Sequence, residues 1–128
     1  MTQKKKYDLV CSLGSNCSAC MQLSARGLRK ISLPFDWVWY DSVFSMQKIA
    51  EGFKNNFSDF MKQENLRKLT EEEFSDSHPD RFQYEDLETK LRYYNHFYKT
   101  KNENAEIIRG ISKFRKRCKR LEIGRAHV

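Results

Sequence analysis

The chain has 128 residues with a net charge of +7 at neutral pH, and 13% of its residues are aromatic. This length predicts one domain with a single core. The mean hydropathy is −0.81, and no run approaches the roughly 20 apolar residues of a membrane-spanning helix, which excludes such a helix. The apolar run after the lysines at 4–6 is too short for a signal peptide, so we expect an unexported, cytoplasmic protein.

The N-terminal part predicts a strand followed by a helix. Residues 7–13 read Tyr-Asp-Leu-Val-Cys-Ser-Leu, a short run of strand formers that Gly14 closes. A helix is expected over residues 17–25, where the two polar residues before it can cap it and Gly27 is placed to end it.

The next segment predicts an extended stretch and then a second helix. Pro34 restricts the residue before it to extended backbone, so residues 31–40 do not begin as a helix. In an extended segment Phe35 and Trp37 lie on one side and anchor the core, while Asp36 faces away from them. From residue 41 the apolar spacing becomes helical, with one face formed by Val43, Phe44, Ile49 and Phe53.

The second half of the chain predicts a helix-rich remainder. A further helical segment is expected over residues 57–69 and a polar surface loop over residues 70–86, while residues 87–97 fit either a helix or a strand. Residues 103–121 predict a helix with basic residues on one side. Its apolar side would consist of Ile107, Ile108, Ile111 and Phe114.

The last seven residues, 122–128, read Glu-Ile-Gly-Arg-Ala-His-Val. Back-translated in one frame they match a common sequencing adapter, and the next adapter codon in that frame is a stop. We therefore predict that residues 1–121 form a single, incomplete domain. Residues 122–128 would then be an adapter artefact rather than natural sequence.

The cysteines predict free thiols rather than disulfides or a metal site. Cys17 and Cys20 have the spacing of a zinc-binding pair, but zinc needs four ligands and the second pair is missing. We therefore expect no metal. Cys11, Cys20 and Cys118 are interpreted as core or incidental thiols.

Cys17 is the strongest candidate for chemistry because it lies where the predicted helix begins. The positive end of a helix lowers a cysteine pKa and produces the nucleophilic thiolate. The alternative is that Cys17 is a small packing residue beneath the strand. A thiolate nucleophile needs a histidine base: His78 is interpreted as a loop residue, and His96, within an aromatic-rich segment, is either that base or a structural residue.

Three blocks of sequence resemble the signature of a family of unknown function that is classed with the papain-like cysteine peptidases. They are Ser-Leu-Gly-Ser-Asn-Cys at 12–17, Gly-Leu-Arg-Lys-Ile-Ser at 27–32 and Pro-Phe-Asp-Trp-Val at 34–38. Residues 57–66 and the basic helix ending at residue 121 resemble further parts of the family. The resemblance implies an α+β fold of papain-like type with the nucleophile at the start of the first helix.

The resemblance also implies roles for individual residues. Cys17 would attack a peptide, amide or ester carbonyl and His96 would carry the proton, although Phe97 stands where the family commonly has an acidic residue. Cys11 replaces the glutamine of papain's oxyanion hole, so Asn16 would supply that donor together with the Cys17 N–H. Asp36 would orient the histidine or shape the site. This chemistry needs no cofactor.

A function of another class is compatible with the charge distribution. Basic residues are concentrated between positions 109 and 120, and such clusters bind nucleic acids or other polyanions. The runner-up prediction is therefore a non-catalytic basic module that binds a polyanion through residues 109–120.

Overall fold

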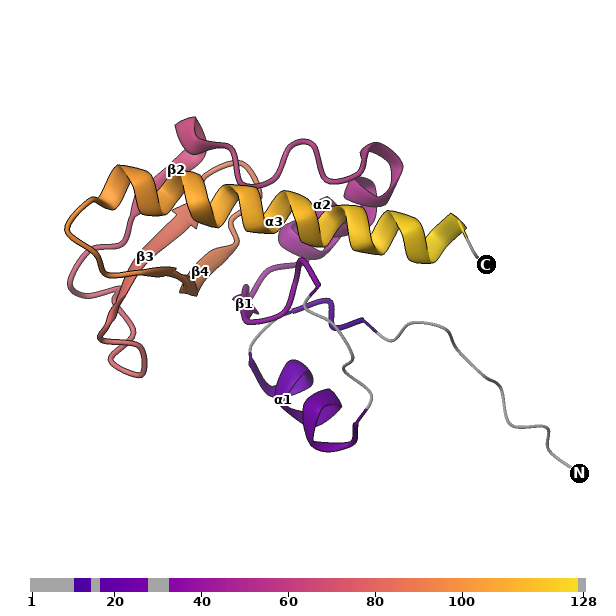
Figure 1. The fold of residues 1–128 in the computed structure, drawn as a ribbon, viewed down its shortest axis with the longest axis horizontal. Coiled ribbons are helices and arrows are strands. Elements are labelled where there is room, and N and C mark those ends of the chain that lie inside the picture. The colour runs from indigo at the N-terminus through magenta and orange to yellow at the C-terminus, as the bar shows by residue number, and fades with distance from the viewer. Residues whose placement is uncertain (1–10, 15–16, 28–32, 127–128) are drawn as a thin grey trace, which may run out of the picture.

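The computed structural model describes residues 11–14, 17–27 and 33–126, with side chains for these except residues 17–20 and 123–126. Its elements are α1 (Cys17–Ala25), β1 (Val38–Trp39), α2 (Val43–Asn55), the 3-10 helix η1 (Gln63–Asn65), β2 (Leu66–Lys68), β3 (Arg81–Asp86), β4 (Arg92–Tyr98) and α3 (Glu103–Ala126). The strands form one antiparallel sheet in the order β1-β4-β3-β2. In Figure 1, β1 lies between the long helix α3 and the short helix α1. The predicted α+β class is confirmed.

One row of side chains runs across all four strands. Arg67 of β2 is opposite Glu85 of β3. Glu85 is in turn opposite Arg92 of β4, which is opposite Trp39 of β1 on its other side. Because paired residues in a sheet point to the same face, these four side chains lie together.

The core is dominated by aromatic rings. Phe35 is fully buried, and its ring contacts those of Phe57, Phe60 and Phe114 edge-on, at centroid separations of 5.0, 5.7 and 6.4 Å. Edge-to-face geometry is favourable for aromatic pairs. Phe35 therefore joins the turn before β1 to the C-terminal helix.

Helix α3 forms where the sequence predicts a helix. Asn102 caps it, since its side-chain oxygen accepts from the backbone N–H of Ala105 at 3.0 Å. Phe114 is buried, as its place on the predicted apolar side requires, and Cys118 and Leu121 are also buried. Ile108 is 55% exposed, so its assignment to the apolar side is wrong.

Helix α2 also forms where the sequence predicts a helix, but its buried residues differ in part from the predicted apolar face. Ser42 caps it by accepting from the N–H of Ser45 at 3.2 Å. Ile49 is buried, but Val43 and Phe44 are exposed. Ser45, in the same first turn, is buried in place of these two apolar residues, so the predicted face holds only from the middle of the helix onward.

Residues 57–69 do not form the predicted helix. The backbone of Asn56, Phe57 and Met61 is left-handed, with φ values of 53°, 59° and 56°, and such backbone ends an α-helix. The segment makes tight turns and then enters η1 and β2. Its apolar spacing resembles that of a helix because the turns also bury Phe57, Phe60 and Met61.

The predicted loop over residues 70–86 is correct only for its first part. Residues 81–86 form β3, and the ambiguous segment that follows contains β4. Because Arg81 and Glu85 are charged, the sequence of this segment indicates an exposed loop. In the fold they are partly buried against charged or aromatic neighbours, which only the strand pairing brings near.

Residues 34–37 form a turn instead of an extended segment. Trp37 has a φ of 67°, a conformation that costs a non-glycine residue of order 1–3 kcal/mol. The turn buries both Phe35 and Asp36 and leaves Trp37 partly exposed. The expectation that Asp36 faces away from the core is therefore wrong, because sides alternate only along extended backbone.

The described part of the predicted first strand, residues 11–13, has no regular secondary structure, and residues 7–10 lie outside the described residues. Each helix in the described ranges is too short or too polar to cross a membrane.

Candidate functional site

Helix α1 begins at Cys17, so the candidate nucleophile occupies the first position of the helix, as predicted. Gly27 follows the helix with a φ of 68°, the left-handed conformation typical of a helix end. Backbone N–H groups in the first turn of a helix have no partner within it, and the helix dipole is positive there. An anion is therefore stabilised at this position. Asn16 and the side chain of Cys17 lie outside the described part of the structure.

The loop before α1 is held against Tyr40, the residue that follows β1. Gly14 has a φ of 89°, and a Cβ atom there would be 3.1 Å from the ring of Tyr40. The Tyr40 hydroxyl donates to the carbonyl oxygen of Leu13 at 3.1 Å. The Gly14 N–H donates to the side chain of Ser12 at 3.2 Å. These contacts set the path of the chain toward Cys17 and require glycine at position 14.

His96 lies on β4 with both ring nitrogens buried. Its ring packs edge-on against Tyr93 at a centroid separation of 5.0 Å. Burial, followed by the charges of Arg117 and Lys113, lowers the pKa of His96 to about 3, although the backbone of Asp36 acts in the opposite direction. The imidazole is therefore neutral at pH 7.

Asp36 meets His96 through its backbone, while its carboxylate holds the turn closed. The side chain is almost fully buried, and Oδ2 accepts from the N–H of Leu33 at 2.9 Å. The N–H of Asp36 donates to the carbonyl oxygen of Leu33 at 3.3 Å. The structure thus brings together two of the predicted site residues.

Trp37 lines two cavities, one on α1 and one on α3. The larger, of about 940 Å³, is lined by Met21, Gln22 and Ala25 of α1, and its volume is typical of ligand sites. Its other walls include Trp37, Trp39, Tyr94 and His78. The smaller cavity, of about 140 Å³, includes His96. His78, which sequence reasoning assigned to a surface loop, therefore lies on the cavity that α1 borders, and His96 lies on the other.

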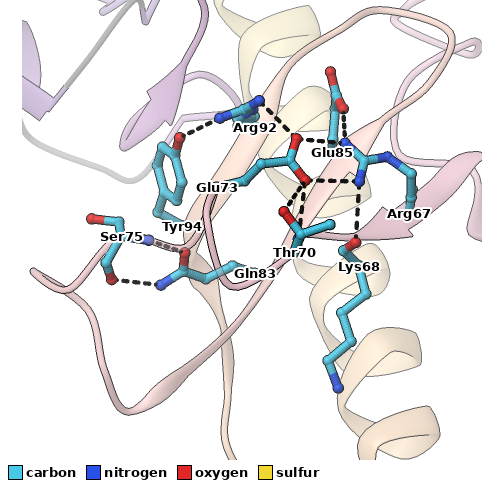
Figure 2. Close-up of polar contacts among 9 residues, drawn as sticks. All are labelled: Arg67, Lys68, Thr70, Glu73, Ser75, Gln83, Glu85, Arg92 and Tyr94. Carbon is cyan, nitrogen blue, oxygen red and sulfur yellow. Dashed lines mark hydrogen bonds and ion pairs between the residues drawn. The ribbon is translucent and has the colours of Figure 1, made fainter.

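Glu73 lines the larger cavity and belongs to a network of ion pairs behind it (Figure 2). Glu73 accepts two hydrogen bonds from Arg67, both of 2.9 Å, and one from Arg92 of 3.0 Å. Arg67 also pairs with Glu85. The bonds from Arg67 hold the pKa of Glu73 well below its usual range. Two arginines and two glutamates balance, so the network carries no net charge and the charge of Glu73 at the cavity is compensated.

The network also positions the aromatic residues of the cavity. Arg92 donates to the Tyr94 hydroxyl at 3.2 Å, and its guanidinium lies 5.1 Å from the centroid of the Trp39 ring. The rings of Trp39 and Tyr94 contact each other edge-on at 6.0 Å. The cavity therefore has a rigid aromatic wall.

The two thiols whose side chains are described lack nucleophilic character. Burial raises the pKa of Cys118 to about 12, and burial together with the charge of Asp36 raises that of Cys11 to about 11. Both are protonated at pH 7, as expected of core thiols. Within the described ranges, no three His, Cys, Asp or Glu side chains are grouped in a way that could hold a metal ion.

Two of the basic residues of α3 make hydrogen bonds or ion pairs with other residues of the protein. Arg109 pairs with Glu106, and Arg115 donates to the carbonyl oxygens of Phe57 and Phe60. These arginines stabilise the fold, which reduces the part of the 109–120 cluster that could contact a polyanion.

Sequence reasoning missed Glu73 and Trp39 as cavity residues, and Arg92 as a partner of Glu73. Trp39 and Arg92 lie in strands whose neighbours are known only from the register, and Glu73 lies in a turn whose partners come from two strands, so no local signal identifies them. The one available signal is the pairing of opposite charges across strands, at Arg67, Glu85 and Arg92, which is visible only after β2, β3 and β4 are recognised as strands.

Comparison with known proteins places this chain in a family. An uncharacterized protein of Acanthamoeba polyphaga mimivirus is 42% identical over 62 residues, which are 48% of this chain and 28% of that relative. The chain thus spans little more than a quarter of the relative's length. No solved structure matches the chain. A family model matches residues 8–123, so the chain belongs to the family described as "Putative papain-like cysteine peptidase (DUF1796)".

Proposed function

We propose that the protein is a thiol-dependent acyl hydrolase or acyltransferase in which Cys17 is the nucleophile. The observation that carries the proposal is that α1, which begins at Cys17, borders the cavity of about 940 Å³ through Met21, Gln22 and Ala25. Positions 17, 21 and 25 are four residues apart, and residues with that spacing lie along one face of a helix. Membership of a family described as papain-like peptidases supports the same chemistry.

In the proposed reaction the histidine base takes the proton of the Cys17 thiol, and the resulting thiolate attacks the carbonyl carbon of a peptide, amide or ester. The carbonyl oxygen becomes an oxyanion, which the Cys17 N–H and the Asn16 side chain bind. The bond to the leaving group breaks as that group takes a proton from the histidine base. Water, or another acyl acceptor, then releases the acyl group and restores the thiol.

The histidine base is assigned to His96, as the resemblance implies, and Asp36 is its positioning residue through the backbone contact. His78 is the competing candidate because it lines the same cavity as α1. A base with a pKa near 3 takes up a proton weakly at pH 7. If His96 acts in its present surroundings, the acid limb of kcat/KM lies near pH 3.

The cavity favours an uncharged, apolar group beside the carbonyl. Trp37, Trp39 and Tyr94 supply aromatic surface, and the charges of the ion-pair network cancel. Apolar and aromatic groups gain most from burial against such walls. We therefore expect substrates with an aromatic or bulky aliphatic acyl group.

Two variants of one helix test the nucleophile. The full chain is assayed on nitrophenyl esters with acetyl, hexanoyl and phenylacetyl groups and on fluorogenic peptides. Cys17→Ser is expected to lower turnover by about a hundredfold or more, whereas Cys20→Ser, the matched control three residues further on, is expected to retain it. Equal turnover in the two variants would overturn the assignment.

Thiol labelling provides a second measurement that needs no substrate. Cys17 should react with iodoacetamide at mildly acidic pH faster than Cys11 and Cys118, whose pKa values are raised, and the difference should vanish on unfolding. Labelling of Cys17 no faster than Cys118 contradicts the proposal. Absence of turnover together with a steep salt dependence of RNA retention would favour the polyanion-binding alternative.

A further inference from the structure

The larger cavity has polar lining residues as well as aromatic ones. Ser75, Ser77 and His78 all line it, and they belong to the loop that precedes β3. Ligand pockets commonly combine apolar walls with a few polar groups that fix the orientation of the ligand. The acyl chemistry proposed above accounts for the aromatic lining but gives the two serines no role.

The buried amide of Gln83 holds this loop in place. Gln83 lies in β3 and is only 2% exposed. Its Nε2 donates to the carbonyl oxygens of Ser75 at 3.0 Å and of His78 at 3.1 Å. Its Oε1 accepts from the Ser75 N–H at 2.8 Å, and Figure 2 shows the two residues facing each other. One side chain therefore fixes both ends of the segment 75–78.

These hydrogen bonds use only backbone atoms of the loop. Among the described residues, none forms a hydrogen bond with the side chain of Ser75, Ser77 or His78. A hydroxyl group both donates and accepts, and an imidazole ring also forms hydrogen bonds. The loop therefore offers hydrogen bonds to a ligand in the cavity.

The charges of the lining indicate what kind of polar group fits there. None of the described residues that line the cavity is a lysine or an arginine. The carboxylate of Glu73 already accepts hydrogen bonds from Arg67 and Arg92. An anionic group would leave water without gaining an ion pair to a lining residue, which is costly. The described lining therefore favours an uncharged hydrogen-bonding group.

We propose that Gln83 is a positioning residue of the larger cavity, holding residues 75–78 where their side chains bind an uncharged hydrogen-bonding group of the ligand. That group, for example a carboxamide, would lie next to the apolar part held by the aromatic residues. A loop fixed before the ligand arrives reduces the entropy lost on binding. The inference rests on the proposed function in taking this cavity as the ligand site, but it concerns binding and not bond cleavage.

Tryptophan fluorescence measures this binding directly, since both tryptophans of the chain, Trp37 and Trp39, line the cavity. The full chain carrying Cys17→Ser, in which turnover does not consume the probe, is titrated with phenylacetamide and with ethylbenzene. The two probes have similar shapes, but only the first has a hydrogen-bonding group. Gln83→Leu is expected to weaken phenylacetamide binding about tenfold and to change ethylbenzene binding less than twofold.

Two further variants separate positioning from a general loss of stability. Ser45→Ala removes another buried hydrogen bond, the one of 2.7 Å to the carbonyl oxygen of Thr89, at a residue outside the cavity lining. It should bind both probes as the parent does. Ser75→Ala combined with Ser77→Ala removes the two hydroxyl groups without altering the core. This double variant should weaken phenylacetamide binding selectively, and it tests the loop even where Gln83→Leu does not fold.

The ratio of the two affinities decides the outcome. Equal weakening of both probes by Gln83→Leu, or unchanged phenylacetamide binding in the double serine variant, would overturn the proposal. Phenylacetate should bind the parent more weakly than phenylacetamide, and tighter binding of phenylacetate would exclude an uncharged group. Selective phenylacetamide binding by a chain without any turnover would refute the acyl chemistry and leave this inference intact.

Discussion

Gly110 of α3 lies directly against the ring of Phe97 of β4: a Cβ atom at position 110 would be only 2.4 Å from Cε1 of that ring. Phe97 is fully buried, so its ring has no free space into which to move. This close approach brings the helix onto the sheet beside His96. Gly110 itself lines the smaller cavity.

Gly110→Ala tests whether the steric clash with Phe97 costs more stability than the higher helix propensity of alanine adds. In an exposed helix the change would stabilise the protein by up to about 1 kcal/mol, but overpacking of a core typically costs about 1–3 kcal/mol. Because the ring cannot move away, we expect a net loss of stability in urea unfolding. Ser112→Ala, at an exposed position two residues later, is the control and should stabilise the protein by a few tenths of a kcal/mol, about the difference in helix propensity. A more stable Gly110→Ala protein would contradict the observed packing.

Phe35 and Trp37 are expected to differ in their contributions to stability. Phe35→Ala should cost about 3–5 kcal/mol because its ring is fully buried among three others. Trp37→Ala should cost less than half as much, since Trp37 is only partly buried. Thermal and urea unfolding of the two variants measure the difference. Equal losses would mean that Trp37 belongs to the core.

Arg115 should stabilise the fold through its contacts with two backbone carbonyl groups. Its replacement by Met is expected to cost about 1.5–3 kcal/mol, the usual value for hydrogen bonds to a charged group. Arg115→Lys should recover only part of this, because one ammonium group lacks the forked geometry of the guanidinium. Lys116→Met, at the next and exposed position of the same helix, is the charge-matched control. A loss no larger than that of Lys116→Met would show that the two hydrogen bonds contribute little.

His96 should make stability depend on pH. Its folded pKa of about 3 lies below the usual value of 6.5, so below pH 6.5 the unfolded chain binds a proton that the folded protein does not. Stability from this residue therefore falls as the pH drops from 6.5 toward 3. The expected loss is about 2 kcal/mol between pH 7 and pH 5.

The comparison of wild type with His96→Gln isolates this contribution. The variant should lose about 2 kcal/mol less between these two pH values, measured by urea unfolding in phosphate-free buffer. Glu106, whose pKa is lowered by Arg109, acts in the same direction only below pH 4.5. Burial raises the pKa of Asp86, which has the opposite effect, and both groups remain in the two proteins. Identical pH profiles would show that His96 is protonated in the folded state.

The C-terminal seven residues should be dispensable for stability. Leu121 is the last residue of the described core, and the exposed Glu122 makes one side-chain hydrogen bond, of 3.2 Å, with Asn56. Deletion of residues 122–128 is therefore expected to cost less than about 1 kcal/mol. Deletion that also removes Leu121 should cost about 2 kcal/mol or more. Resequencing the locus tests the adapter origin separately, and an intact gene with the same ending would exclude it.

The sequence by itself determined the three helices and the position of Cys17. Helices depend on interactions between residues three or four apart, so apolar spacing within residues 41–53 and 103–121 identifies α2 and α3. The same local signals, with Gly27 at the end, place Cys17 at the start of α1. The α+β class and the family follow from these elements and from the three sequence blocks.

Only the tertiary structure decided which residues meet Trp37, Glu73 and His96. Strands β2 and β3 form from short charged segments whose stabilising partners are distant in the chain, and the turn at 34–37 places Asp36 inside because Phe35 packs against α3. His78 lies on the cavity beside α1, and His96 lies on the one beside α3. No local pattern separates these two histidines, because burial and charge at each depend on residues that are neighbours in space and not in sequence.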